Sequence, residues 1–231
     1  MIEKGITMDL RRAYENEAQN FKYDRSIERN TALIAVHNDE IIGTLEYDFI
    51  GLEAAEVTHF KVLNDSKKIM NGLIKEFNYW HPFIKRLYFN ELIESHIKPQ
   101  NNIIHFKDAC LLYKVDIADI VPEQLTVSKA KFDRVDKWIE SSEDVVVGTV
   151  EIDDKIVCVD GYSRLVSAYL KGLESVYIYK DIVEDKSLYE VCLSWCKAEG
   201  IYTIEDLSKR IVSAEEHQRV WIDRCQENLN G

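Results

Sequence analysis

The segment from Val157 to Ala168 constrains this chain more than any other, because its periodicity changes within a single turn. An apolar run rich in β-branched residues ends at Asp160-Gly161, and a pattern with apolar residues on one helical face begins near Leu165. The sequence therefore predicts a strand, a tight turn and a helix in direct succession. Such a turn points backbone N–H groups and the positive end of a helix at one place, which suits an anion such as phosphate.

Several side chains of this turn are candidates for binding or chemistry. Arg164 would add a guanidinium, which can bind phosphate oxygens through two parallel hydrogen bonds. Asp160 could position a hydroxyl group or a Mg²⁺ ion, and Gly161, Tyr162 and Ser163 complete the candidate phosphate- or nucleotide-binding set. The alternative is an ordinary connection between a strand and a helix, in which Asp160 or Ser163 is only a cap and Tyr162 packs at the surface.

Length and composition predict a folded α+β protein with two domains. The chain has 231 residues, enough for two cores, and its 46% hydrophobic and 30% charged residues leave little room for disorder. The formal net charge of −12 opposes binding to nucleic acid, which requires Lys and Arg to neutralise phosphates. No stretch approaches the roughly 20 apolar residues of a membrane helix, so we expect a cytoplasmic protein that does not bind membranes. The sequence does not indicate an oligomeric state.

The cysteines and histidines do not suggest a metal site. The five cysteines lack the spacing of a zinc site or of a secreted disulfide framework, and we interpret them as reduced thiols. Cys192 and Cys196 lie four residues apart and would share a helix face, where core packing explains them better than redox chemistry. The six histidines show no metal-ligand spacing either, so no structural metal is predicted.

The first half of the chain predicts three antiparallel strands, a helix and a fourth strand. Asn38-Asp39-Glu40 marks a hairpin turn, and Asn64-Asp65-Ser66 offers capping oxygens for the helix. A charged stretch over residues 9–30 has a weak apolar face and is expected to begin as a helix. The expected strands cover residues 32–37, 41–47, 55–63 and 83–89, and the expected helix covers residues 67–77.

This order, with Glu40-Ile41-Ile42-Gly43-Thr44 in the second strand, resembles the central part of the GNAT acetyltransferase fold over roughly residues 30–95. In that family the loop after the third of these strands carries an Arg/Gln-x-x-Gly-x-Gly/Ala signature, whose backbone amides hold the pyrophosphate of acetyl-CoA. Residues 62–72 retain only Gly72, and Asp65 would put a negative charge beside the phosphates. The resemblance implies a GNAT-like domain over residues 1–110 without a recognisable acetyl-CoA loop.

A second domain is expected over residues 115–182. Turn residues cluster at Pro99-Gln100-Asn101-Asn102, and this cluster with the run to about Lys114 is the predicted boundary. A short apolar segment then ends at Pro122-Glu123-Gln124, ahead of the central turn. The other expected elements are a helix over residues 129–141, strands over residues 145–150 and 156–159, and a closing strand over residues 175–179.

Residues 183–231 are predicted to form a C-terminal helical extension. A first helix would end at Gly200, and Thr203-x-x-Asp206 and Ser213-x-x-Glu216 have the form of capping boxes that open two more helices. Two successive helices can suggest a helix-turn-helix, but residues 214–227 are not the basic helix that groove reading requires. We therefore expect a packed helical cap.

The succession over residues 115–182 resembles the ParB/sulfiredoxin-like domain. The matching elements are Val121-Pro122-Glu123-Gln124, the Asp160–Arg164 turn and the Gly172-Leu173 dipeptide after its helix. Members bind nucleotide phosphates at this turn, with outcomes that include CTP hydrolysis, reduction of a sulfinylated cysteine and phosphorylation of free serine from ADP. Sulfiredoxins carry a catalytic Cys just before the His-Arg of the turn. Tyr162 and Ser163 stand in that region, which excludes sulfiredoxin chemistry.

The Asp-Gly start of the turn is closest to the free serine kinase group, whose turn reads Asp-Gly-His-His-Arg. That resemblance implies phosphate-binding roles for Gly161 and Arg164 and catalytic roles for Asp160 and for Glu123, as a general base, although both histidines are missing. The leading hypothesis is a nucleotide- or phosphate-binding protein that takes a nucleoside di- or triphosphate with Mg²⁺, as a small-molecule phosphotransferase or a nucleotide hydrolase. The alternatives are a noncatalytic binding or assembly module and a CoA-dependent N-acyltransferase.

Overall fold

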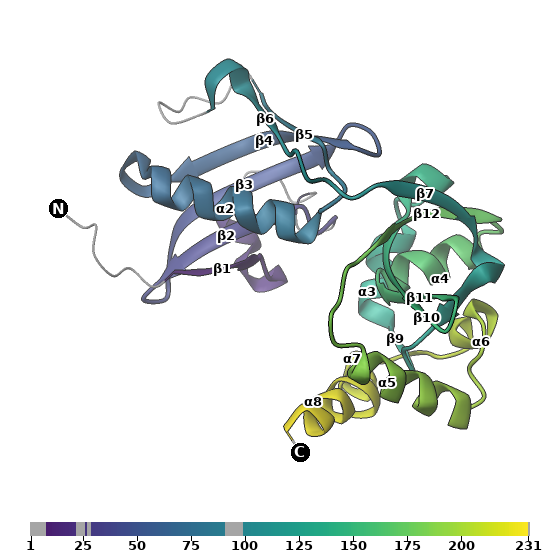
Figure 1. The fold of residues 1–231 in the computed structure, drawn as a ribbon. Coiled ribbons are helices and arrows are strands. Elements are labelled where there is room, and N and C mark those ends of the chain that lie inside the picture. Colours follow the sequence, from purple (N-terminus) through teal and green to yellow (C-terminus); the bar gives the residue numbers. More distant parts are fainter. Residues whose placement is uncertain (1–7, 22–25, 27–28, 91–98, 231) are drawn as a thin grey trace. The chain divides into compact units, whose positions relative to one another are not determined.

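The computed structural model describes residues 8–21, 26, 29–90 and 99–230. The chain forms two compact units, Met1–Ala109 and Cys110–Gly231 (Figure 1). Each unit has its own sheet and its own helices, which confirms the α+β class predicted from the sequence.

The first unit is a six-stranded sheet with one long helix. The parallel pair is β4 with β5, because the helix α2 (Lys67–Trp80) carries the chain back between them, and the other neighbours are antiparallel. The predicted hairpin is confirmed, with Asn38 and Asp39 at positive φ in its turn. In sheet order the strands are β1 (Asp9–Arg12), β2 (Ala32–His37), β3 (Glu40–Phe49), β4 (Ala54–Val62), β5 (Arg86–Phe89) and β6 (Ile103–His105).

The helix α2 covers one face of this sheet (Figure 1). Its residues Ile69, Leu73 and Phe77 recur every four positions and are buried, so they lie on one helical stripe toward the sheet. Burying each of these side chains contributes roughly 1.5–3 kcal/mol. The predicted cap is also confirmed, because the Ser66 hydroxyl accepts a hydrogen bond from the amide of Ile69 at 3.4 Å.

One expectation for the first unit was wrong. Residues 9–12 do not begin a helix but form β1, which hydrogen-bonds along β2, and a 3-10 helix follows at Glu15–Asn20. The Arg11 guanidinium holds this segment in place through Glu17, at 2.9 and 2.7 Å. The division between the two units, after Ala109, falls within the expected boundary region of residues 99–114, and the 3-10 turn Gln100–Asn102 and β6 in that region belong to the first unit. The later part of the 9–30 stretch lies largely outside the described residues.

The second unit is built on a five-stranded mixed sheet. The hairpin of β10 and β11 turns at Asp153-Asp154, where both residues have positive φ, and β12 and β8 lie parallel to β10 and β11 respectively. The sequence did not indicate β7, which pairs antiparallel with β12. In sheet order the strands are β7 (Leu112–Asp116), β12 (Ser175–Lys180), β10 (Val146–Ile152), β11 (Lys155–Asp160) and β8 (Ile120–Pro122), and a small second sheet pairs β13 (Ile211–Val212) with β9 (Val127–Ser128).

The helices of the second unit share one hydrophobic core. Cys192, Leu207 and Trp221 of the C-terminal region are buried in the same cluster as Val147 and Leu165 of the central sheet and helix. Residues 183–230 are therefore part of the second compact unit. The helices are α3 (Lys129–Asp136), α4 (Tyr162–Leu170), α5 (Ser187–Ala198), α6 (Ile204–Ser208), α7 (Ala214–His217) and α8 (Asp223–Asn230), with a π segment at Gln218–Ile222 and 3-10 turns at Ile117–Asp119 and Ser142–Asp144.

The capping signals located the C-terminal helices, while the end of α3 was predicted too late. Thr203 and Ser213 cap α6 and α7, as expected from their sequence motifs. α3 ends at Asp136 instead of continuing to Ser141, and the Lys171 ammonium binds the carbonyl oxygens of Asp136 and Ile139 at 2.5 and 2.9 Å. Ser141 then opens a separate turn with a capping box.

The five cysteines are free thiols, as the sequence predicted. Three of them, Cys158, Cys192 and Cys196, are buried. Among the helices of the described part of the chain, none is both long enough and apolar enough to span a bilayer.

Candidate functional site

The Asp160–Arg164 turn joins β11 directly to α4, as the sequence predicted. Gly161 is the N-cap of α4 and has a left-handed backbone with φ of 95°. A Cβ atom at this position would lie 2.8 Å from Val147 Cγ1 and 2.9 Å from Arg164 Nη2. Only glycine satisfies both the backbone angle and the close approach of the guanidinium.

The first turn of α4 presents donors that the chain itself does not use. Gly161 has no side chain to cap the helix, and within the described residues the amides of Tyr162, Ser163 and Arg164 find no acceptor. The first amide in a helical bond is that of Leu165, which donates to the Gly161 carbonyl at 2.9 Å. Three N–H groups at the positive end of a helix are the donor set that binds anions.

Arg164 lies over this helix end and is held there by Asp160. Its Nη2 is 3.2 Å from Asp160 Oδ2, and the two side chains are 22% and 48% exposed. An ion pair this exposed contributes at most about 1 kcal/mol to stability, because water screens it. Its larger consequence is positional, since it restrains a flexible side chain beside the amides. It also places a carboxylate near any bound anion, which opposes binding unless a cation lies between them.

Tyr179 also lies near this helix end, and the sequence analysis did not identify it. A Cβ atom at Gly148 would lie 2.8 Å from the Tyr179 hydroxyl oxygen and 3.5 Å from Asp160 Cβ, so the phenol crosses β10 toward β11. Burial and then Asp160 raise the pKa of Tyr179, so its hydroxyl keeps its proton at neutral pH. Gly148 lies at a register shift of β10, and an isolated glycine inside a strand is the signal that could have indicated this close approach.

Glu123 and Tyr162 lie together in the interior, below the turn. Glu123 is 5% exposed and Tyr162 is 6% exposed. The Tyr162 hydroxyl is 3.1 Å from Glu123 Oε1, accepts a hydrogen bond from the Glu123 amide at 3.2 Å, and contacts the carbonyl oxygen of Cys158. Tyr162 therefore does not pack at the surface, and its ring is not available to a ligand. Only its amide faces the candidate anion site.

These contacts require a proton on Glu123. The Tyr162 hydroxyl has one hydrogen and cannot donate it both to Cys158 and to an ionised Glu123. A protonated Glu123 resolves the conflict by donating to the Tyr162 oxygen. Burial raises the pKa of Glu123 to about 8, although hydrogen bonds with Cys192 and Tyr162 lower it. At neutral pH this carboxyl is therefore neutral and enclosed, which is unfavourable for a general base that must reach a ligand.

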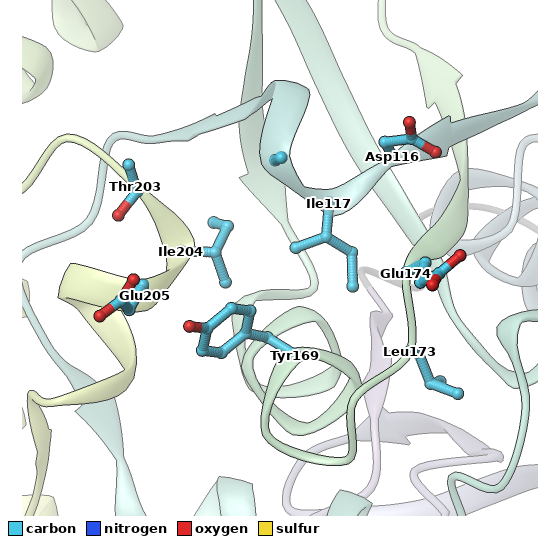
Figure 2. Close-up of a pocket in the computed structure, with 9 residues that line it drawn as sticks. Asp116, Ile117, Tyr169, Leu173, Glu174, Thr203, Ile204 and Glu205 are labelled. Carbon is cyan, nitrogen blue, oxygen red and sulfur yellow. The ribbon is translucent and has the colours of Figure 1, made fainter.

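A separate pocket lies at the other end of α4 (Figure 2). It has a volume of about 490 Å³. Ile117 follows β7, Tyr169 and Leu173 lie near the C-terminal end of α4, and Ile204 begins α6. Its polar lining includes three carboxylates and no Lys, Arg or His side chain.

The structure brings the six predicted site residues into two groups. Asp160, Gly161 and Arg164 form a half-buried group with the amide of Ser163, whose side chain is also half-buried. Glu123 and the Tyr162 side chain form the buried group. In the described residues no three His, Cys, Asp or Glu side chains are arranged to hold a metal ion. The catalytic roles of Glu123 and Asp160 stay predictions.

Comparisons with known proteins give only weak similarity. No family model matches the sequence, and no curated protein is detectably similar to it. Among solved structures, an Agrobacterium tumefaciens protein is similar over 42% of this chain and 61% of its own length, with 17% identity and a TM-score of 0.30. N-acetylglutamate synthase from Neisseria gonorrhoeae, complexed with coenzyme A and N-acetyl-glutamate, is similar over 37% of this chain and 26% of its own, with 14% identity and a TM-score of 0.29.

With TM-scores of 0.30 and 0.29, neither similarity carries an argument about fold, cofactor or reaction, so the GNAT-like resemblance of the first unit stays a prediction. Neither name identifies a ParB/sulfiredoxin-like protein, so that resemblance of the second unit stays a prediction. The candidate acetyl-CoA loop also gains no glycine from the structure. Gly72 lies inside α2, where a Cβ atom would be 3.0 Å from Leu10, so it serves helix packing and not the loop.

Proposed function

We propose that the second unit binds a phosphate-bearing small molecule at the Asp160–Arg164 turn. One observation carries this proposal: the Arg164 guanidinium lies beside a glycine N-cap whose following three amides have no acceptor in the described part of the chain. A planar guanidinium and convergent helix amides together match the oxygens of a phosphate group. Tyr179 adds a hydroxyl donor near Asp160.

The acidic character of the turn indicates how the ligand would be bound. The chain has a formal net charge of −12, and Asp160 is a carboxylate at the turn itself, so a bare anion would be repelled. Mg²⁺ is usually held by one or two carboxylates together with substrate phosphates. Asp160 could supply that carboxylate, which fits a nucleoside di- or triphosphate carrying Mg²⁺ better than free phosphate.

Binding is better supported than catalysis. Phosphoryl transfer needs a group that positions or activates a nucleophile, and Glu123 was the predicted base. Its carboxyl is buried and bonded to Tyr162 and Cys192, so it supports the start of α4 from below. A noncatalytic binding module and a phosphotransferase or nucleotide hydrolase share the same binding step, and a turnover assay with bound nucleotide distinguishes them.

Calorimetry with Mg²⁺ complexes of ATP, ADP and CTP, and with inorganic phosphate, tests the proposal. Arg164→Ala should weaken binding by about 1.5–3 kcal/mol, or roughly 10- to 150-fold, the range for hydrogen bonds to charged groups. Arg164→Lys should recover only part of this loss, because an ammonium cannot form the two-pronged contact. Arg219→Ala is the matched control, since it removes the same charge from an exposed site elsewhere in the second unit.

The proposal is wrong if the wild-type protein binds none of these ligands, or if Arg164→Ala binds them as well as the wild type does. Acetyl-CoA belongs in the same panel. Saturable binding of acetyl-CoA that survives Arg164→Ala and is lost on replacing Lys67 and Lys68 would support the acyltransferase alternative in the first unit instead.

A further inference from the structure

The pocket at the C-terminal end of α4 does not belong to the phosphate-binding turn. The turn lies at the start of α4, whereas Tyr169 lies near its last residue, so most of a nine-residue helix separates them. A helix of that length spans roughly 13 Å. No residue that lines the pocket takes part in the contacts of Asp160 or Arg164. A ligand of this pocket would therefore be distinct from the ligand of the turn.

The middle of the pocket is apolar. Ile117 and Ile204 are buried, and Tyr169 and Leu173 are half-buried with one surface toward the opening. In Figure 2 the side chains of Ile117 and Ile204 face each other across the centre, with the Tyr169 ring beside them. A concave apolar surface of this kind favours a ligand with an apolar stem or ring.

Carboxylates lie on both sides of this apolar middle. Figure 2 shows Asp116 and Glu174 on one side and Glu205 on the opposite side. Asp116 ends β7 and Glu174 directly precedes β12, and the Ile117 amide donates to the Glu174 carbonyl at 2.9 Å. Both side chains are exposed, and within the described residues neither has a hydrogen bond or an ion pair.

The opposite side is partly neutralised. Glu205 forms an ion pair with Lys209 at 2.9 Å, one turn further along the chain. Both side chains are well exposed, so this pair is weak and can exchange for another cation. The pocket thus has two carboxylates on one side, Asp116 and Glu174, an apolar middle, and one carboxylate paired with a lysine on the other side, Glu205.

We propose that this pocket binds a small organic cation with an apolar stem, and specifically a linear di- or polyamine. One ammonium group lies against Asp116 and Glu174, the methylene chain packs on Ile117, Ile204 and the Tyr169 ring, and the second ammonium group approaches Glu205. The Tyr169 ring also favours a cation near its face. A bare divalent metal ion fits less well, because the described residues contain no three-ligand arrangement.

Titration with spermidine and 1,5-diaminopentane, followed by NMR of the Ile117 and Ile204 methyl groups, tests this proposal. At about 0.15 M ionic strength the two amines should shift these signals saturably, and uncharged 1,5-pentanediol should not. The double change Asp116→Asn with Glu174→Gln should weaken amine binding by about tenfold or more, the expected loss when a charge partner is removed. Glu205→Gln should have a smaller effect on the diamine and none on pentylamine.

The control addresses general attraction of amines to an acidic protein. Asp153→Asn with Asp154→Asn removes the same two charges from the exposed β10–β11 turn, where asparagine tolerates the positive φ of both residues. This control should bind spermidine as the wild type does. Equal weakening in both double variants, or methyl signals that do not respond to amine, overturns the proposal. If the double variant of the pocket fails to fold, Asp116→Asn alone changes one exposed side chain and should also weaken amine binding relative to the wild type.

Discussion

Each unit contains a strand that leads through a short turn into a helix on its sheet, and the two helices begin in different ways. In the first unit, the turn after β4 contains Asn64 at positive φ, and the Ser66 side chain then caps α2. In the second unit, Gly161 has positive φ and is itself the N-cap of α4, with no side-chain bond. Both turns reverse the chain, but only α2 has a side chain that accepts a hydrogen bond from its first-turn amides.

The comparison shows that a side-chain cap and an anion site compete for the same donors. Ser66 uses an amide of α2 that a ligand would otherwise need. A glycine N-cap costs only a few tenths of a kcal/mol relative to a side-chain cap, and the start of α4 has a further source of stabilisation. Tyr162 provides it, because the first residue of α4 is buried and bonded to Glu123, whereas Lys67 at the start of α2 is exposed.

The largest expected effect concerns this buried anchor. Glu123 keeps its proton in the folded state up to about pH 8, against a reference value of 4.5 when unfolded. Between these pH values the unfolded chain has released a proton that the folded chain retains. The free energy of unfolding therefore falls as pH rises, and it becomes constant above about pH 8. Glu123→Gln removes this dependence. We expect the variant to gain stability relative to the wild type, on the order of 4 kcal/mol between pH 4.5 and 8.5.

Urea unfolding of both proteins across this pH range measures the difference. Glu184→Gln, which removes the charge of an exposed carboxylate in the same unit, should follow the wild-type curve closely. Parallel curves for wild type and Glu123→Gln would mean that Glu123 is ionised in the folded protein, and the proton assignment at Tyr162 would then be wrong.

The second effect concerns the glycine N-cap. Gly161→Ala should lower the free energy of unfolding by about 2–4 kcal/mol. The cost of a left-handed backbone for alanine and the cost of the steric overlap of its Cβ with Val147 and Arg164 both contribute. Gly172→Ala is the matched control at the other end of α4. It also has positive φ, but no atom within 4 Å would meet its Cβ, so only the backbone term of about 1–2 kcal/mol applies. Equal losses in chemical denaturation would show that Arg164 does not approach Gly161 as described.

The smallest effect concerns the cap of the first unit. Ser66→Ala should destabilise α2 by about 1 kcal/mol, measurable as a small downward shift of the unfolding midpoint. If a free helix end were sufficient for anion binding, this change would also create a phosphate site next to Lys67 and Lys68. We expect calorimetry to detect no new site, because α2 lacks a guanidinium fixed beside its first turn. A new phosphate site in Ser66→Ala would mean that a free helix end binds phosphate without a neighbouring guanidinium, and that Arg164 is not needed for the site at α4.

The strand, turn and helix at each of these two sites were predictable because the residues that specify them are close together in the sequence. A β-branched run, an Asp-Gly pair and apolar residues three and four apart predicted β11, the turn and α4. Ser66, Thr203 and Ser213 similarly marked the starts of helices, since a cap depends on residues within one turn. Gly161 and Arg164 could be selected as a pair for the same reason.

The tertiary structure decided which of these side chains are exposed and which partners they have. The weak apolar face of residues 9–30 indicated a helix at the start of that stretch, but pairing with β2 made residues 9–12 a strand. Glu123 and Tyr162 are 39 positions apart, and only the parallel pairing of β8 with β11 brings them together and buries them. Tyr179 and the acidic pocket likewise depend on neighbours from distant segments. Propensity and capping act within a few residues, whereas burial, proton affinity and pocket shape are set by contacts between segments that the chain order does not specify.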